Sequence, residues 1–166
     1  MELIMLTQEL VNERLEYKDG DLYWRVNRGG KAKVGVKAGA YSLSDGYIYV
    51  SIDGKKQAAH RLIFLLLNGH LPEEIDHIDR NKTNNKIDNL REANHSQNMF
   101  NCSKHISNTS GIKGVSWCNT TKSWQARIRV GKGKRISVGY FKSIDNAEQA
   151  MKIARLQYHG EYAHSA

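Results

Sequence analysis

The residues best suited to chemistry lie in one stretch, EIDHIDRNKTNNKIDNLREANHSQNMFN, which spans residues 74–101. Asp76 and His77 open it, Asn89 follows twelve residues after His77, and Asn98 comes nine residues later. Carboxylate and amide oxygens suit a hard divalent cation, and a neutral imidazole is a good general base near neutral pH. Metal-assisted phosphodiester cleavage needs these parts, together with a neighbour that holds the base in position.

A plain polar loop is the alternative, because Asp and Asn favour turns by bonding to nearby backbone groups. The fixed order of the Asp-His pair and the two later asparagines favours the site. Adjacent residues of a strand point to opposite faces, so Asp76 and His77 act together only if the strand bends or another residue fixes the imidazole. Asn89, across the hairpin, is the candidate for that task, and Asn98 could turn its amide oxygen toward the ion.

Hydrophobic spacing indicates the elements that must position these side chains. A β-hairpin followed by a helix is expected, with extended runs at 74–78 and 87–91 and the turn DRNKTNN between them. Ser96 is the expected N-cap of a helix over 97–105. Upstream, KKQAAHRLIFLLLNG at 55–69 predicts a buried helix that ends at its Asn-Gly pair.

The first part of the chain predicts a helix and several strands. Thr7 can cap a short helix in which Leu10, Val11 and Leu15 recur at helical spacing. Alternation over residues 47–52, flanked by Asp-Gly pairs, predicts strands and hairpins. We expect residues 1–44 to form a helix and strand segment that adds DNA contacts or scaffolding.

Residues 60–98, HRLIFLLLNGHLPEEIDHIDRNKTNNKIDNLREANHSQN, resemble the HNH endonucleases, in particular the homing and free-standing nucleases of phages. The hallmark is a ββα-metal core with the pattern DHIDxNxxNNxxxNLRxxxxxxN. The resemblance implies that Asp76 is a metal ligand and His77 the general base. It further implies that Asn89 fixes the loop and orients His77, and that Asn98 is the second ligand, where many relatives have a His.

Other residues of the motif keep two interpretations. Asn81 and Asn85 match loop positions with structural roles. Arg61, in the upstream HRL, either faces a phosphate or serves packing and capping. Asn101, one helical turn after Asn98, is an alternative ligand.

The implied site offers only oxygen ligands, which favours one Mg²⁺ or Mn²⁺ ion per active site and not zinc. The two cysteines, Cys102 and Cys118, lack CxxC spacing, so we expect reduced thiols rather than a disulfide framework or a structural zinc site.

The net charge of +8 is unevenly distributed over the 166 residues. Residues 1–100 hold 14 basic and 14 acidic residues, whereas residues 101–166 hold 11 basic residues against Asp145, Glu148 and Glu161. Such a basic module predicts binding of a polyanion, with a merely soluble basic surface as the alternative.

Residues 111–166 predict three strands and a helix after a polar linker at 102–110. The helix has a capping-box spacing at Asp145 and Glu148 and an apolar stripe formed by Ala147, Ala150, Met151, Ala154 and Tyr158. Strand alternation sends Gln125, Arg127 and Arg129 to one face, and a basic sheet face can read DNA in the major groove.

Residues 111–163 resemble the plant Apetala, or ethylene-response-factor, type of DNA-binding domain. The shared features are KGVSW, SWQARIR, the Gly-x-Phe of VGYF and a helix ending in HGEYA. Ser137 and Arg127 depart from the plant pattern, so the base preference does not carry over. The DNA-binding residues expected from the motif, the resemblance and the basic turn are Arg61, Lys113, Trp117, Trp124, Arg127, Arg129, Lys132, Lys134 and Arg135, with core packing as the alternative for each Trp.

The sequence thus predicts an α+β protein: a ββα-metal (HNH) nuclease domain at 45–101, with its core about 72–101, and a C-terminal three-stranded antiparallel sheet packed on one helix. The expected activity is endonucleolytic hydrolysis of double-stranded DNA by a phage homing-type nicking enzyme, as a monomer or homodimer. A non-catalytic DNA-binding regulator is the alternative, and an RNA-directed protein would need exposed aromatic platforms. A hydrophobic content of 40%, a longest apolar run of LIFLLL and an N-terminus unlike a signal peptide predict a cytosolic protein without a membrane partner. The resemblance to phage nucleases implies that this is the cytoplasm of a phage-infected bacterial cell.

Overall fold

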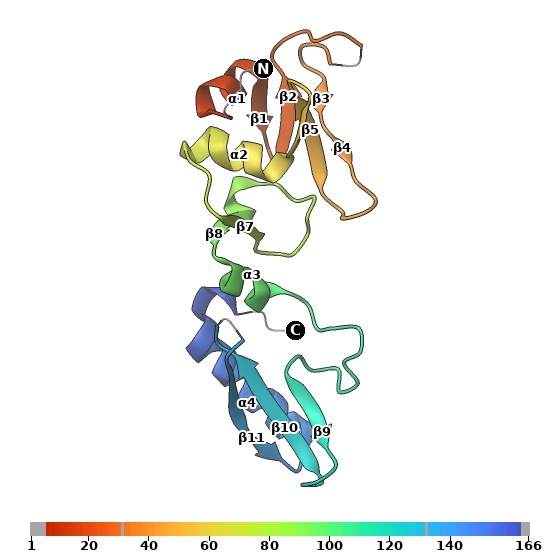
Figure 1. Ribbon diagram of the computed structural model, residues 1–166, viewed down its shortest axis with the longest axis vertical. Helices are drawn as coiled ribbons and strands as arrows, with labels where there is room; N and C mark the ends of the chain where they lie inside the picture. Colours follow the sequence, from red (N-terminus) through yellow and green to blue (C-terminus); the bar gives the residue numbers. More distant parts are fainter. Residues whose placement is uncertain (1–5, 31, 132, 164–166) are drawn as a thin grey trace. The chain divides into compact units, whose positions relative to one another are not determined.

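The computed structural model describes residues 6–163 except 31 and 132. The chain divides into two compact units, residues 1–92 and 93–166, and each contains helices and small antiparallel sheets (Figure 1). None of the helices in this described part has the length and apolar character needed to cross a bilayer. The mixture of helices and small antiparallel sheets confirms the α+β class.

The first unit begins with α1 (Gln8–Arg14), capped by Thr7 as predicted: its side chain accepts from the Leu10 amide at 3.2 Å. A hairpin follows, and its turn is Asp19-Gly20, with φ of +47° and +92°. An Asp-Gly pair suits this turn because both positions need positive φ. The hairpin strands are β1 (Leu15–Lys18) and β2 (Asp21–Trp24), and β3 (Lys37–Ala38) pairs with β2.

A second small sheet and the long helix of this unit come next. The Asp53-Gly54 turn again has positive φ at both residues and closes a hairpin. The expected helix over 55–69 begins only at Ala59, because the four residues before it pair as a strand; it ends at Gly69, in the left-handed conformation. The elements are β4 (Ala40–Tyr41), β5 (Ile48–Ile52), β6 (Lys55–Ala58) and α2 (Ala59–Asn68).

One core serves the whole first unit. Val11, Leu22 and Trp24 from the first part of the chain belong to the same buried cluster as Val50 and Ile63. Each such apolar side chain contributes about 1.5–3 kcal/mol by leaving water. The segment before residue 45 therefore packs as an integral layer of this unit.

The hairpin expected around the candidate site forms with one difference. β7 (Glu74–His77) pairs with β8 (Leu90–Ala93), but residues 87–89, expected to be extended, form the 3₁₀ turn η1 (Ile87–Asn89). The extended run thus begins at Leu90.

Helix α3 (His95–Asn101) starts two residues earlier than predicted. Its N-cap is Asn94, not Ser96, because the Asn94 side chain accepts from the Gln97 amide at 3.0 Å and the Gln97 side chain accepts from the Asn94 amide at 2.8 Å. This reciprocal pair is a capping box, which satisfies two amides at once. Ser96 is already inside the helix.

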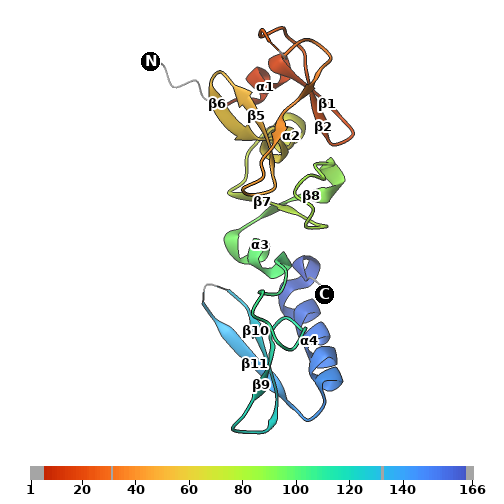
Figure 2. The same ribbon diagram turned by 90° about the vertical axis from the view of Figure 1, so that its right-hand side faces the viewer.

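The second unit contains the three predicted strands, in the order β11-β10-β9, and one face of this sheet is covered by α4 (Figure 2). Its core is formed by Val115, Ala126, Ile128, Met151 and neighbouring alanines. The elements are β9 (Val115–Cys118), β10 (Ser123–Arg129), β11 (Arg135–Phe141), α4 (Ile144–His159) and η2 (Gly160–Tyr162).

Two details of α4 differ from prediction. Ser143, not Asp145, caps it, since its hydroxyl accepts from the Asp145 amide at 3.1 Å. Tyr158 leaves 42% of its surface exposed, whereas Arg155 and His159 are buried. Both buried residues satisfy backbone carbonyls, of Lys113 and Arg129 respectively, at 2.6 and 2.7 Å, which apolar periodicity does not reveal.

Candidate active site and nucleic-acid interface

Asp76 and His77 are the last two residues of β7, and each has only 5% of its surface exposed. The pairing of β7 continues past its end, because the Ile78 amide donates to the Asn89 carbonyl at 2.9 Å. Neighbouring side chains of a strand face opposite sides, and these two accordingly have different partners. The residues predicted to perform the chemistry are thus held at a strand end, largely away from solvent.

Arg91, on the neighbouring strand β8, balances the charge of Asp76. Its Nε and Nη2 donate to Oδ2 of Asp76 at 2.9 and 2.7 Å, and the two side chains are 15% and 6% exposed. A carboxylate taken out of water is costly unless a cation compensates it. Arg91 therefore supplies the positive charge that keeps the Asp76 carboxylate stable in this buried position.

His77 is hydrogen-bonded to Asn85, from the turn that follows β7. Its Nε2 lies 3.0 Å from Oδ1 of Asn85, and Asn85 has only 2% of its surface exposed. The sequence pattern assigned the brace of His77 to Asn89 and treated Asn85 as a structural loop residue. The structure thus shows a direct bond between the imidazole of His77 and Asn85, which the pattern did not assign to it.

Two further rings pack around His77. The ring centroids of His60 and Tyr47 lie 5.1 and 6.0 Å from that of His77, and those of His60 and Tyr47 lie 5.1 Å apart. Burial, and then the nearby charges of His77 and Arg61, lower the pKa of His60 to about 3. His60 therefore stays neutral near physiological pH.

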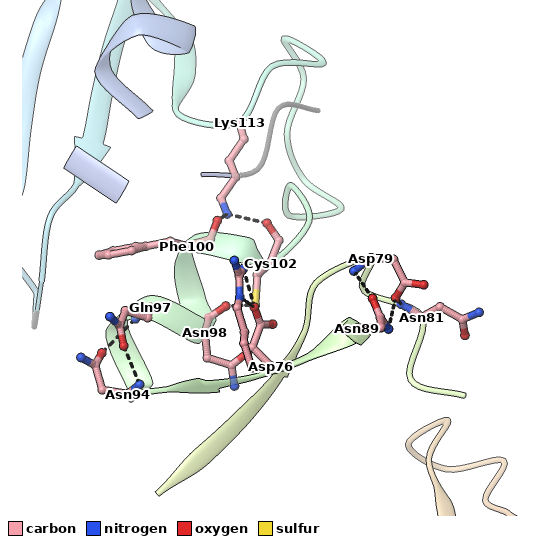
Figure 3. Close-up of polar contacts among 11 residues, drawn as sticks. Asp76, Asp79, Asn81, Asn89, Asn94, Gln97, Asn98, Phe100, Cys102 and Lys113 are labelled. Carbon is pink, nitrogen blue, oxygen red and sulfur yellow. Dashed lines mark hydrogen bonds and ion pairs between the residues drawn. The ribbon is translucent and has the colours of Figure 1, made fainter. Parts of the chain in front are cut away.

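The side chain of Asn89 bonds to residues of the loop that follows β7. Its Nδ2 donates to Oδ1 of Asp79 at 2.9 Å, and its Oδ1 accepts from the Asp79 amide at 3.0 Å (Figure 3). Its Nδ2 also donates to the Asn84 carbonyl at 2.8 Å. Asp79 also accepts from the Asn81 amide at 2.8 Å. These contacts lie within the loop, and the predicted role of Asn89, to fix the loop and orient His77, stays a prediction.

Asn98 lies in α3, which belongs to the second compact unit, whereas Asp76 and His77 belong to the first. The helix is fixed within its own unit by Phe100, whose ring stacks on His159 with centroids 3.8 Å apart and planes at 6°. Asn98 is partly exposed and Asn101 is buried, with 4% exposure. The choice between them as second ligand stays a prediction.

The available donors suit a hard cation. Among the residues that the structure describes, no group of three or more His, Cys, Asp or Glu side chains is arranged to hold a metal ion. Mg²⁺ commonly binds through one or two carboxylates and completes its shell with water and phosphate oxygens. The buried carboxylate of Asp76 is an oxygen donor of the type that this ion prefers.

The second unit presents the basic sheet face predicted from the sequence. Arg127, Arg129 and Arg135 are exposed on β10 and β11, and Arg129 and Arg135 are directly paired. No acidic side chain in the described chain forms an ion pair with these three arginines. Lys134 is also exposed, and Lys132 lies outside the described residues.

The aromatic residues of this sheet differ in exposure. Trp124 packs against the second core, which agrees with the packing alternative. Trp117, directly opposite it on β9, leaves 45% of its surface exposed. Tyr140, 52% exposed on β11, accepts from Nε2 of Gln125 at 2.6 Å and extends the polar face. Tyr140 was not anticipated, because alternation along β11 groups it with Ile136 and Val138 of the core face. A register shift between Ala126 and Arg127 pairs it with Gln125 instead.

Two residues expected at DNA, Lys113 and Arg61, bond to backbone carbonyls of the protein, and their contact with DNA stays a prediction. Nζ of Lys113 donates to the carbonyl of Phe100 at 2.9 Å and to that of Cys102 (Figure 3). It also donates to the Met99 carbonyl at 3.3 Å. It thereby satisfies the C-terminal end of α3, where cations are favourable. Arg61 reaches the carbonyls of residues 72 and 73 at 3.5 Å, in line with its capping alternative.

Comparison with known proteins defines the class of this site. Residues 57–100 match the family described as HNH endonuclease. This range contains Asp76, His77, Asn85, Asn89 and Arg91, and the family acts on DNA. No solved structure matches the chain.

Two viral proteins are similar over most of this chain. Protein 3.8 of Escherichia phage T7 is 35% identical over 113 residues, which cover 66% of this chain and 90% of that protein. The uncharacterized HNH endonuclease L560 of Acanthamoeba polyphaga mimivirus is 38% identical over 120 residues, 69% of this chain and 59% of that protein. The chain belongs to the HNH endonuclease family. The family match ends before residue 111, and nothing in these comparisons supports the resemblance of residues 111–163 to the Apetala type.

Proposed function

We propose that this protein is a metal-dependent endonuclease that hydrolyses phosphodiester bonds in double-stranded DNA, in the manner of a phage homing-type nicking enzyme. The observation that carries the proposal is the buried Asp76–His77 pair at the end of β7, inside the segment that matches HNH endonucleases. A carboxylate and an imidazole held side by side at a strand end supply the two kinds of group that metal-assisted hydrolysis uses.

The residues have separate tasks in this proposal. Asp76 and Asn98, or Asn101 in place of Asn98, would hold one Mg²⁺ or Mn²⁺ ion. When bound, the ion supplies Lewis-acid polarisation of the phosphate and stabilises the leaving 3′-oxygen. His77 accepts a proton from the attacking water, and Asn89 fixes the loop that follows β7.

The exposed sheet face of the second unit is proposed to hold the DNA. Positive charge comes from three strand residues at spacings set by the strands: Arg127, Arg129 and Arg135. Lys134 in the adjoining turn adds to it, and Lys132, expected from the sequence to bind DNA, is proposed to do the same. Each cation that neutralises a phosphate releases a counterion, so binding weakens as salt is added. With one active site per chain, a nick in one strand is the expected product.

A non-catalytic DNA-binding regulator is the competing function, favoured by the exposed arginines if the first unit is inert. Supercoiled plasmid or phage DNA incubated with the protein and Mg²⁺ distinguishes the two. Appearance of nicked DNA supports the endonuclease, whereas DNA that is bound but intact under all divalent-ion conditions supports the regulator. Removal of residues 109–166 is a poor test of the sheet, because it also removes Lys113 and His159, which hold α3.

A further inference from the structure

The turn between β7 and η1 contains a buried asparagine that the motif does not assign to catalysis. Asn85 is 2% exposed and lies 3.0 Å, through Oδ1, from Nε2 of His77. The neighbouring turn residues Asn81 and Lys82 are exposed. Burial of one polar side chain in an otherwise solvated turn is unfavourable unless its hydrogen bond compensates.

This bond determines which nitrogen of His77 can act as a base. A neutral imidazole carries one N–H, and an amide oxygen accepts only from a nitrogen that carries a proton. Contact with Oδ1 of Asn85 therefore places the proton on Nε2 and the basic lone pair on Nδ1. The opposite tautomer would set two acceptors against each other at 3.0 Å.

We propose that Asn85 is a positioning residue that fixes the tautomer and orientation of His77, and that the β1–β2 hairpin holds Asn85 in place. The proposal rests on the proposed function, in which His77 is the general base. It assigns a task to the N-terminal segment, which the HNH match at 57–100 does not include.

The hairpin contacts the chain at and just after Asn85 in three ways. The hydroxyl of Tyr17 accepts from the Ile87 amide at 3.2 Å, and Asp19 forms an ion pair with Lys86 at 3.0 Å. At Gly20 an added Cβ would lie 3.1 Å from the Lys86 amide nitrogen and 3.4 Å from the Asn85 carbonyl carbon. The turn of the hairpin thus lies directly against this backbone.

The first test reads the proton directly in the metal-free full-length protein. Nitrogen-15 NMR at a pH well above the ordinary imidazole pKa distinguishes a protonated from a bare ring nitrogen. We expect Nε2 of His77 to carry the proton, and its N–H resonance to be visible because the bond and burial slow exchange with water. A bare Nε2 in the wild type overturns the proposal without any variant.

Matched variants test the role of Asn85. Asn85→Leu keeps the volume but removes the acceptor, whereas Asn85→Asp keeps an acceptor oxygen. The control, Asn84→Leu, alters the adjacent turn residue. It removes the bond from Nδ2 of Asn84 to Oδ2 of Asp79 at 2.6 Å but leaves the Asn84 carbonyl available to Asn89, so it measures the effect of loosening the loop without touching His77. The Nε2–H resonance should vanish in Asn85→Leu and persist in Asn85→Asp and Asn84→Leu. Its persistence in Asn85→Leu overturns the proposal.

Kinetics give the second readout. Loss of a residue that orients a catalytic group commonly costs about 10–100-fold, so kcat for DNA nicking should fall by that factor in Asn85→Leu with little change in KM. Asn85→Asp should retain more activity than Asn85→Leu, and Tyr17→Phe should lower kcat by a smaller factor. An Asn85→Leu protein with wild-type kcat overturns the proposal. If the wild type does not cut DNA at all, the proposed function fails, while the NMR result still decides the tautomer.

Discussion

Replacing Arg91 with Gln removes the guanidinium whose Nε and Nη2 donate to Oδ2 of Asp76 at 2.9 and 2.7 Å. The carboxylate stays buried, with 6% of its side chain exposed, but loses this cation. Breaking a buried pair from one side costs about 3–5 kcal/mol, a large share of the roughly 5–15 kcal/mol that stabilises a typical domain. We therefore expect Arg91→Gln to lose that much unfolding free energy in the absence of divalent ions.

Urea denaturation followed by backbone amide NMR signals of the first unit measures this loss separately from the second unit. The matched control is the double variant Asp76→Asn with Arg91→Gln, which removes both charges and should recover much of the stability. Mn²⁺ or Mg²⁺ should stabilise Arg91→Gln more than the wild type, because the ion then supplies the missing positive charge, and Asp76→Asn should abolish this response. An Arg91→Gln protein as stable as the wild type, or a double variant no more stable than the single one, would refute the reasoning.

Three further predictions concern pH, DNA binding and folding of the second unit. Burial lowers the pKa of His60 from 6.5 to about 3, so the unfolded state takes up a proton at a higher pH than the folded state. The free energy of unfolding should therefore fall by up to about 1.4 kcal/mol per pH unit between pH 6.5 and 3. Urea midpoints measured against pH should fall less steeply for His60→Phe than for the wild type. Replacing Arg127 and Arg129 together with Gln should reduce the slope of log affinity against log salt by about 2, and an unchanged slope places DNA elsewhere. Gly114→Ala should destabilise the second unit by at least about 1 kcal/mol in thermal melts, because φ is +84° and the new Cβ would meet the Arg127 carbonyl at 2.6 Å.

Local signals predicted much of the fold. The Asp53-Gly54 turn, Gly69 at the end of α2 and the three strands of the second unit all lie where short-range chemistry indicated. These features depend on φ preferences and alternation over a few residues, so a single sequence suffices to find them.

Features that depend on distant contacts were not predictable in this way. Asn85 looked like an ordinary turn residue, and only its burial distinguishes it from its neighbours. Arg91 was visible in the motif, but its pairing with Asp76 depends on the register of β7 and β8. The stacking of Phe100 on His159 joins positions 59 residues apart, which no local pattern encodes.

Competition between adjacent caps explains the errors at helix starts. Asn94 and Ser96 are both good N-caps, and Gln97 lies at the reciprocal capping-box position of Asn94. At α4, Ser143 precedes Asp145 and takes the cap, which leaves the acidic residue in the first turn, where the helix dipole favours it.

The central claim is that His77 is the base in a DNA-cutting site, and the rate of plasmid nicking tests it most directly. With Mg²⁺ and saturating DNA, we predict nicking by the wild type and by the control Asn84→Leu. His77→Ala should bind DNA with unchanged affinity and nick about 10²–10⁴-fold more slowly. Equal nicking rates for wild type and His77→Ala would contradict the account.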